Sequence, residues 1–349
     1  MSTTDDTTRP NETDRVAAAL RAQAAALETN YRAPFWLPGA HVQTIVPALF
    51  ARLPLPTYRR ERWDTPDGDF IEVDWVDGKS PRPNAPLFVL FHGLEGGSGS
   101  HYARSLAAAA HARGWHAAIP HFRSCSGPLN LLPRFYHLAD SAEVDWVLRR
   151  LAARHAGPIV VAGVSLGGNV LLHWLAQRRE DASVVAAAAA ISAPLDVHAG
   201  SEMLTHGFGM VYTRSFLKTL KVKALEKLAQ YPGLFDADAV LASRTMYEFD
   251  NVVTAPLHGF RNTHDYYTQA TILPMLGEIV VPTLVLNARN DPFLPGHALP
   301  ARHEVGAAVE LDQPEHGGHV GFMTGPFPGR SDWLSQRVFA YFSPFVSHG

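Results

Sequence analysis

The strongest local signal in the chain is Ile159-Val160-Val161-Ala162-Gly163-Val164-Ser165-Leu166-Gly167-Gly168-Asn169. An apolar, β-branched run leads directly into a Gly-x-Ser-x-Gly pattern, and a helix-forming segment follows at 170–178. This order predicts a strand, a sharp turn and a helix, with the Ser165 hydroxyl raised above the carboxyl edge of a sheet. Gly163 and Gly167 fit such a turn, because a Cβ atom at either position would crowd it.

The segments on either side of this turn alternate between strand and helix patterns. Residues 57–64 and 69–76 alternate apolar with polar side chains, and the turn residues 66–68 between them predict an antiparallel hairpin. The unbroken apolar run 87–91 predicts a strand that is buried on both faces. Further along, the patterns predict helices at about 101–113, 139–155 and 331–342, and strands at 115–120, 183–192, 282–287 and 307–311. Such alternation predicts an α/β fold with a mostly parallel sheet and helices on both faces.

The alternation breaks between residues 195 and 277, where the sequence is mostly helical or irregular. This segment holds every lysine of the chain except Lys79. We therefore expect 195–277 to be an inserted, mainly helical cap over the catalytic face. The core would then consist of residues 31–194 and 278–349, after an N-terminal tail and helix at 1–30.

Within this cap, apolar residues and four lysines between 215 and 229 predict an amphipathic helix. The simplest interpretation is a cap helix whose apolar face packs on the body and whose lysines lie in solvent. The alternative is an interfacial helix that docks on anionic lipid and admits acyl chains, which would give the protein a peripheral membrane contact. Two acidic stretches, 248–250 and 265–267, belong to the same cap, and we expect their carboxylates to hold it to the core.

The composition limits the class of protein. Of the 349 residues, 46% are hydrophobic, which is enough for one large core with an inserted lobe. The formal net charge of −3 provides no field that favours nucleic acid, so we expect no nucleic-acid partner. The single cysteine, Cys125, rules out a disulfide framework within the chain and suits a reducing cytoplasm. The longest apolar run, 182–193, is too short to span a bilayer and residues 1–14 lack a signal-peptide pattern, so we expect a cytoplasmic protein without membrane insertion.

A serine nucleophile needs a base within hydrogen-bond reach and a carboxylate that orients this base. Asp291 follows the strand predicted at 282–287, so it would lie at the carboxyl edge of the sheet. His319 lies in a glycine-rich loop after the next strand. Nucleophile, acid and base follow in this order in α/β-hydrolases, so we assign these roles to Ser165, Asp291 and His319.

Three other residues compete for these roles. His316 is a rival base in the same loop as His319, and Asp196, after an earlier strand, is a rival acid. Their positions relative to the strand ends favour His319 and Asp291. Cys125 would be a nucleophile only beside a base, and we expect an inert loop thiol.

The oxyanion of a tetrahedral intermediate needs two preorganised N–H donors. The residue after the nucleophile supplies one of them, the N–H of Leu166. The loop after the strand 87–91 supplies the other, for which we choose the N–H of Leu94.

Cofactor-binding patterns are weak. The Gly-rich turn 96–99 lacks the lysine of a phosphate-binding P-loop, and no dinucleotide Gly-x-Gly-x-x-Gly follows the first strand. His316 and His319 have a spacing that metal ligands can show, but they lie in a loop rather than on a helix. We therefore expect no metal site, and the chemistry needs no cofactor.

Several stretches match a known family of proteins, and they run from about residue 34 to 322. They are Gln43-Thr44, Asp67-Gly68-Asp69-Phe70, His92-Gly93-Leu94-Glu95-Gly96, Phe122-Arg123, Gly163-Val164-Ser165-Leu166-Gly167-Gly168-Asn169, Glu248-Phe249-Asp250, Thr254-Ala255-Pro256-Leu257-His258-Gly259-Phe260, Asp265-Tyr266-Tyr267, Asn287-Ala288 with Asp291-Pro292, and His316-Gly317-Gly318-His319. Through these stretches the chain resembles the YheT-like branch of the α/β-hydrolase superfamily, which is related to the eukaryotic ABHD phospholipases and esterases.

The resemblance implies an α/β-hydrolase fold with esterase or lipase-like activity on carboxylic esters. It also implies that Ser165, Asp291 and His319 are nucleophile, acid and base. Two departures from the family pattern lie off this triad. Ser124 stands where the family usually has glycine, and Leu138-Ala139 replaces a usual Ser-Gly. Both departures bear on the shape of the adjacent pocket wall.

The resulting hypothesis is a serine hydrolase that cleaves a small-molecule carboxylic ester, with a short- to medium-chain acyl group or a lipid-like structure, through an acyl-enzyme intermediate. One alternative is an acyltransferase, in which an alcohol replaces water. A second alternative is a non-catalytic binding protein with an α/β-hydrolase fold; such proteins normally lose a triad member, whereas this sequence contains all three residues.

Overall fold

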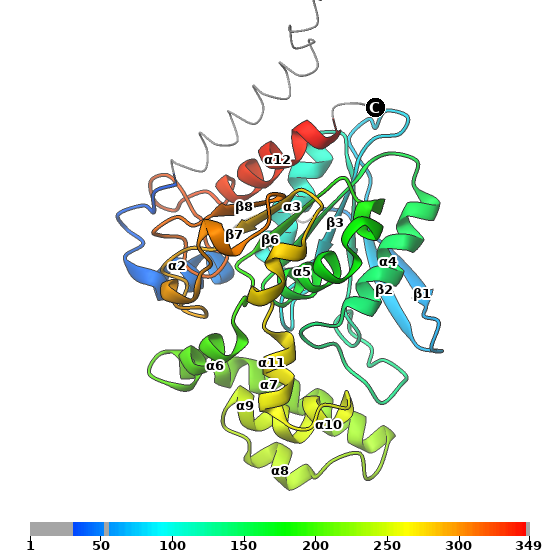
Figure 1. Ribbon diagram of the computed structural model, residues 1–349, viewed down its shortest axis with the longest axis vertical. Coiled ribbons are helices and arrows are strands. Elements are labelled where there is room, and N and C mark those ends of the chain that lie inside the picture. Colours follow the sequence, from blue (N-terminus) through cyan, green and yellow to red (C-terminus); the bar gives the residue numbers. More distant parts are fainter. Residues whose placement is uncertain (1–30, 52–55, 347–349) are drawn as a thin grey trace, which may run out of the picture.

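The computed structural model describes residues 31–51 and 56–346. The tail and helix expected at 1–30 therefore lie outside the described residues. The described chain folds around an eight-stranded sheet with the order β1-β2-β4-β3-β5-β6-β7-β8 (Figure 1). The strands are β1 (Arg59–Asp64), β2 (Phe70–Val76), β3 (Leu87–Phe91), β4 (His116–Pro120), β5 (Ile159–Val164), β6 (Ala187–Ile191), β7 (Thr283–Leu286) and β8 (Val309–Asp312).

The sheet is mostly parallel. Strand β2 is antiparallel to both β1 and β4, so the predicted hairpin is confirmed. The other neighbouring pairs, from β4 to β8, are parallel, which confirms the predicted α/β fold class. Because parallel strands end at the same edge, the loops after β3, β5, β7 and β8 can meet there to build a site.

Helices cover both faces of the sheet. Helices α3 (His101–Ala112) and α12 (Trp333–Val346) pack on one face, and α4 (Ser141–Arg154) and α5 (Leu166–Arg178) pack on the other. All residues of β3, β5 and β6 are buried, as their unbroken apolar sequences require. Helix α2 (Gly39–Phe50) and four short 3-10 helices complete this part; the latter are Arg179–Val184, Leu273–Glu278, Gly296–Ala298 and Arg302–Glu304.

Three predicted boundaries are wrong by four residues, and one of them is the end of the last helix, which lies at Val346 rather than at 342. The helix after the serine begins at Leu166, not at residue 170, because the sharp turn ends at Ser165 and the chain enters the helix at once. The strand predicted at 183–192 begins at Ala187, which is the first residue to pair with β5. The charged sequence before it forms the 3-10 helix Arg179–Val184 instead.

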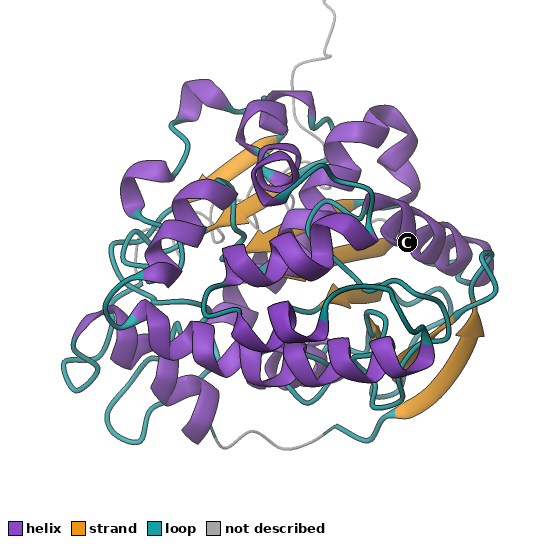
Figure 2. Ribbon diagram, turned by 90° about the horizontal axis from the view of Figure 1, so that it is seen from below, coloured by secondary structure: helices purple, strands orange, loops and turns teal. Residues whose placement is uncertain are grey.

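Six helices lie between β6 and β7 in the chain and beyond the carboxyl ends of the strands, at the bottom of Figure 1. They are α6 (Val197–Thr205), α7 (Gly209–Gln230), α8 (Ala237–Ala242), α9 (Met246–Phe249), α10 (Ala255–Leu257) and α11 (Thr263–Ala270), and a π-helical turn, Asp250–Thr254, joins α9 to α10. Viewed from this side, helices lie in front of much of the sheet (Figure 2). We call these elements the cap; the division of the chain at 194/195 and 277/278 stays a prediction.

None of the helices in residues 31–51 and 56–346 is both long enough and apolar enough to cross a membrane.

Candidate active site

Ser165 occupies a strained turn between β5 and α5. Its φ of 54° and ψ of −119° lie in a region that L-residues rarely adopt, and its N–H donates to the Ile191 carbonyl at 2.8 Å. A methyl group on Gly163 would lie 2.2 Å from the Gly167 oxygen, and one on Gly167 would lie 2.3 Å from the Phe91 oxygen. The prediction that a Cβ atom would crowd both positions is therefore confirmed.

The loops after β7 and β8 bring Asp291 and His319 into direct contact. His319 Nδ1 lies 2.9 Å from Asp291 Oδ2. Asp291 is buried, and its Oδ1 accepts the Phe293 N–H at 2.8 Å, so the carboxylate is fixed on both oxygens. The Phe293 ring also stacks on the His319 imidazole with 4.1 Å between centroids. These contacts hold the imidazole in one orientation.

Helix α2 supports the loop that carries His319. Gln43 Oε1 accepts hydrogen bonds from the Gly317 N–H and from Asn290 Nδ2, both at 2.9 Å. Thr44 Oγ1 accepts the N–H of His319 itself at 2.9 Å. In the sequence, Gln43 and Thr44 stand out only as part of a family match. Their supporting role could not be predicted, because the contacts join residues about 270 positions apart.

The loop after β3 reaches the nucleophile. A methyl group on Gly93 would lie 3.1 Å from the Ser165 Cβ, so the backbone here runs directly against the serine. The Gly93 N–H donates to the Tyr102 hydroxyl, and the Glu95 N–H donates to the Tyr136 hydroxyl, each at 2.8 Å. Leu94 is therefore held between two anchored residues. Leu166 is the first residue of α5, and the first N–H groups of a helix have no partner within it.

A buried histidine precedes this loop. Burial lowers the pKa of His92 to about 3, so its imidazole is neutral. The Phe122 N–H donates to its Nε2 at 3.0 Å, which assigns the proton to Nδ1 and makes that nitrogen the donor to the Gly93 carbonyl at 2.8 Å. His92 thus ties the end of β3 to the loop after β4.

The rival residues have other partners. The Asp196 carboxylate caps α6 by accepting the Ala199 N–H at 3.0 Å. His316 is exposed. Burial raises the pKa of the Cys125 thiol to about 12, as expected of an inert thiol. Within the described residues, no group of three or more His, Cys, Asp and Glu side chains is arranged to hold a metal ion.

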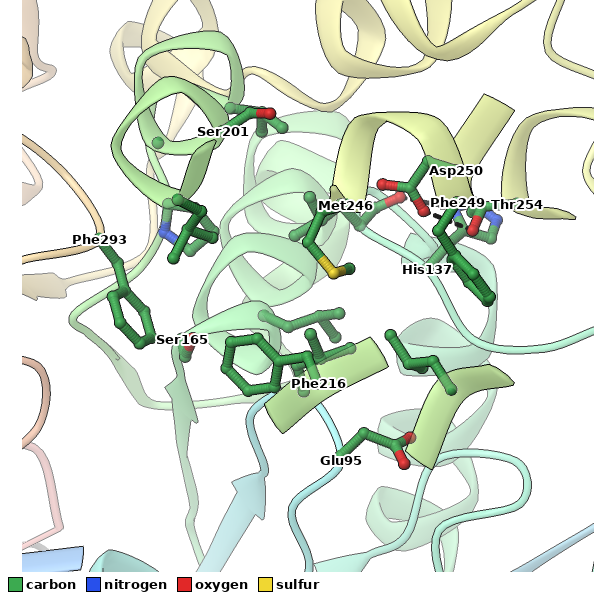
Figure 3. Close-up of a pocket in the computed structure, with 18 of the residues that line it drawn as sticks. Glu95, His137, Ser165, Ser201, Phe216, Met246, Phe249, Asp250, Thr254 and Phe293 are labelled. Carbon is green, nitrogen blue, oxygen red and sulfur yellow. Dashed lines mark hydrogen bonds between the residues drawn. The ribbon is translucent and has the colours of Figure 1, made fainter. Parts of the chain in front are cut away.

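One cavity joins these groups under the cap (Figure 3). Ser165 and His319 both line it, and so do Leu94 and Leu166, the two residues chosen for the oxyanion. Its empty space, including the open mouth, is about 1140 Å³. The wall is mainly apolar and is contributed by core and cap alike; it includes Phe135, Leu138, Pro194, Val197, Leu204, Phe216, Leu220, Met246, Phe249, Phe293 and Leu294.

The lysines of α7 do not all lie in solvent, so that expectation is wrong. Lys223 Nζ lies 2.7 Å from Glu95 Oε1, and this ion pair joins the cap to the loop that carries Leu94. Lys227 is fully buried and donates to the Asn130 carbonyl at 2.6 Å. Of the four lysines, Lys218 is the one whose side chain is exposed. Two of the four lysines, Lys223 and Lys227, therefore bind the core.

The carboxylates of these acidic stretches do not hold the cap to the core, which corrects a second expectation. Glu248 accepts backbone N–H groups at the start of its own helix, and Asp265 pairs with Arg261 four residues earlier. Asp250 bonds to Tyr267 and Thr254, which are also cap residues. Besides the Lys223–Glu95 ion pair, Asn169 of α5 makes this join: it donates to the carbonyls of Pro194 and of the cap residue Ala270.

Both departures from the family pattern fall at left-handed backbone positions. Ser124 and Ala139 each have a φ of 64°, which favours glycine. Ser124 offsets this strain through its hydroxyl, which donates to Asn130 Oδ1 at 2.7 Å and accepts the Asn130 N–H at 3.0 Å. Leu138 lines the cavity, so this departure does shape the pocket wall.

Known proteins resemble the chain in sequence and fold. A model of the alpha/beta hydrolase family matches residues 88–328, more than half of the chain. The chain belongs to this family. The Escherichia coli (strain K12) protein named "Putative esterase YheT" is 41% identical over 302 residues, which are 85% of this chain and 88% of that protein. The resemblance to the YheT-like branch of alpha/beta hydrolases is thereby confirmed.

Other members of the superfamily are more distant. Phospholipase ABHD3 of Mus musculus is 29% identical over 330 residues, which cover 91% of this chain and 79% of that protein. The solved structure of the Pyrococcus furiosus esterase Pf2001 matches with a TM-score of 0.51 and 14% identity, covering 83% of this chain and 91% of that chain. At this identity the match shows the shared alpha/beta hydrolase fold alone.

Proposed function

We propose that this alpha/beta hydrolase is a serine esterase that cleaves carboxylic esters with Ser165 as nucleophile, Asp291 as acid and His319 as base. The observation that carries the proposal is the shared cavity. It is lined by a serine in a strained turn and by a histidine that is bonded to a buried carboxylate. The names of two relatives, an esterase and a phospholipase, support the same class of reaction.

In the first half-reaction, His319 Nε2 takes the proton of Ser165 while Oγ attacks the ester carbonyl carbon. Asp291 accepts the hydrogen bond of the His319 Nδ1–H and stabilises the imidazolium that forms. The N–H groups of Leu94 and Leu166 bind the oxyanion. As the C–O bond to the alcohol breaks, His319 returns the proton to the leaving oxygen, and the acyl group remains on Ser165.

In the second half-reaction, His319 takes a proton from water, whose oxygen attacks the acyl carbon. The tetrahedral intermediate collapses, Ser165 regains the proton and the carboxylic acid leaves. No step requires a cofactor. An acyltransferase would run the same sequence with an alcohol in place of water, so adding alcohol acceptors and measuring the transfer product separates the two activities.

The mainly apolar wall supports a substrate with a short- to medium-chain acyl group or a lipid-like structure. A location in the cytoplasm and a peripheral membrane contact through the cap stay predictions.

The test is hydrolysis of p-nitrophenyl acetate, butyrate, octanoate and palmitate by the wild type and by Ser165→Ala. We expect turnover of at least one ester by the wild type and background rates for the variant. Equal activity of the two proteins would overturn the assignment of Ser165. A wild type that binds these esters without cleaving any of them would favour the non-catalytic binding protein.

A further inference from the structure

The cavity contains a second polar group across from the nucleophile. Figure 3 shows Asp250 on the far side from Ser165, with Met246 between them. Asp250 belongs to the π-helical turn Asp250–Thr254 of the cap. Such turns are rare and occur frequently at functional sites.

The Asp250 carboxyl group is buried, with 8% of the residue exposed. Its Oδ2 accepts the Tyr267 hydroxyl at 2.8 Å, and its Oδ1 accepts the Thr254 hydroxyl at 2.6 Å. Burial raises the pKa of this carboxyl to about 6, because the apolar surrounding disfavours its charged form. Across the described part of the chain, no lysine, arginine or histidine forms an ion pair with it.

The protein's own donors fill only part of the acceptor capacity of this carboxylate. Its two oxygens offer about four acceptor positions, and the protein supplies two hydroxyl donors. A buried charge without a cation is costly in an apolar surrounding unless further hydrogen bonds compensate it. Because Asp250 lines the cavity, a further donor can come from the molecule that occupies it.

We propose that Asp250 is a substrate-recognition residue that binds a hydrogen-bond donor, a hydroxyl or an ammonium group, at the far end of the substrate chain. The inference rests on the proposed esterase function and deepens it by naming the substrate class: esters whose apolar chain ends in such a donor. A methyl end supplies no further donor, and a carboxylate end adds a like charge.

The test uses p-nitrophenyl esters of straight-chain acids from butyric to decanoic acid, each made with a methyl and with a hydroxyl end. A parallel series of acetate esters of alkanols and of the matching diols presents the chain from the alcohol side. The readout is the ratio of kcat/KM between the hydroxyl and the methyl ester at each chain length. This ratio is independent of the amount of folded enzyme.

For the wild type we expect one chain length, in one of the two series, at which the ratio reaches roughly ten. We expect the ratio to fall to about one in Asp250→Asn, which keeps the shape of the side chain and removes its charge. Glu248→Gln, an exposed carboxyl two residues away, is the matched control and should keep the wild-type ratio. Esters of that same length with an ammonium or a carboxylate end identify the donor. If charge dominates, the ammonium ester should have the highest kcat/KM and the carboxylate ester the lowest. A hydroxyl ester with a higher kcat/KM than the ammonium ester assigns a neutral donor.

Ratios of one or less at every length in both series, with the methyl esters hydrolysed, would overturn the inference and leave the esterase function intact. An unchanged ratio in Asp250→Asn would also overturn it. If the wild type hydrolyses no ester of either series, the proposed function fails and this inference fails with it.

Discussion

The sheet core and the cap build opposite walls of the same cavity by different means. On the core side the backbone fixes the position of the serine, through a φ of 54° at Ser165 and glycines that leave no room for a Cβ atom. On the cap side, side chains fix the geometry, through the Lys223–Glu95 ion pair and the bond between Asp250 and Tyr267. From this difference we expect the chemistry to depend on the backbone of the sheet core and the choice of substrate to depend on a few cap contacts.

The largest effects should come from the core. Asp291→Asn and His319→Ala remove the orienting acceptor and the base, and each should lower kcat by roughly 10³- to 10⁴-fold. Thermal unfolding checks that the variants stay folded, because Asp291 is buried whereas His319 lines the cavity. Steady-state hydrolysis of the best p-nitrophenyl ester measures the loss. If either variant kept more than a tenth of the wild-type kcat, the cap would have to supply part of the chemistry.

A substitution in the turn around Ser165 should also have a large effect, in this case on the stability of the protein. In Gly163→Ala the new methyl group meets the Gly167 oxygen at 2.2 Å, and we expect a loss of about 3 kcal/mol in the free energy of unfolding. Gly277→Ala is the control, because no heavy atom lies within 4 Å of its added methyl group. Urea unfolding compares the two variants. Equal stabilities of the two variants would show that the backbone around Gly163 can make room for the added methyl group.

The contact between the two regions should give an intermediate effect. Lys223→Met leaves the Glu95 carboxylate, whose side chain is only 11% exposed, without its cation. We expect a loss of about 2 kcal/mol in the free energy of unfolding and a lower kcat, since Glu95 adjoins Leu94. Lys218→Met on the exposed face of the same helix should change neither quantity. If both variants had the same stability and the same kcat, the cap would not position the loop that carries Leu94.

The smallest loss of stability should come from Asp196, whose carboxylate caps a helix of the cap. Asp196→Ala removes the N-cap of α6 and should cost about 1 kcal/mol in the free energy of unfolding. The kcat for the same p-nitrophenyl ester should stay near the wild-type value. A kcat as low as that of Asp291→Asn would instead make Asp196 the catalytic acid.

The core could be predicted from sequence because its signals are local. Five consecutive apolar residues predicted β3 at 87–91 with both boundaries correct, and the antiparallel hairpin followed from turn residues at 66–68. The hydrogen-bonded pair Asp291 and His319 could be selected because each follows a strand of the parallel part of the sheet. Their catalytic roles stay a prediction.

The cap could not be predicted in the same way. Its charged residues look like a solvated face, but Lys227 is buried and Lys223 pairs with a residue 128 positions away. One partner of Asp250 is likewise distant: Tyr267 lies on α11, and the contact depends on how α11 packs on the π-helical turn. No periodicity in the sequence carries this information, because tertiary contacts determine which side of such a helix is buried.

The most direct test of the central claim is covalent labelling with a fluorophosphonate followed by peptide mass spectrometry. The account predicts a single adduct on Ser165, formed rapidly by the wild type and slowly by His319→Ala, and absent from Ser165→Ala. Lys218→Met should label at the wild-type rate, as a control for general folding. Labelling at another residue, or none in a folded wild type, would contradict the assignment of Ser165 as the activated nucleophile of this alpha/beta hydrolase.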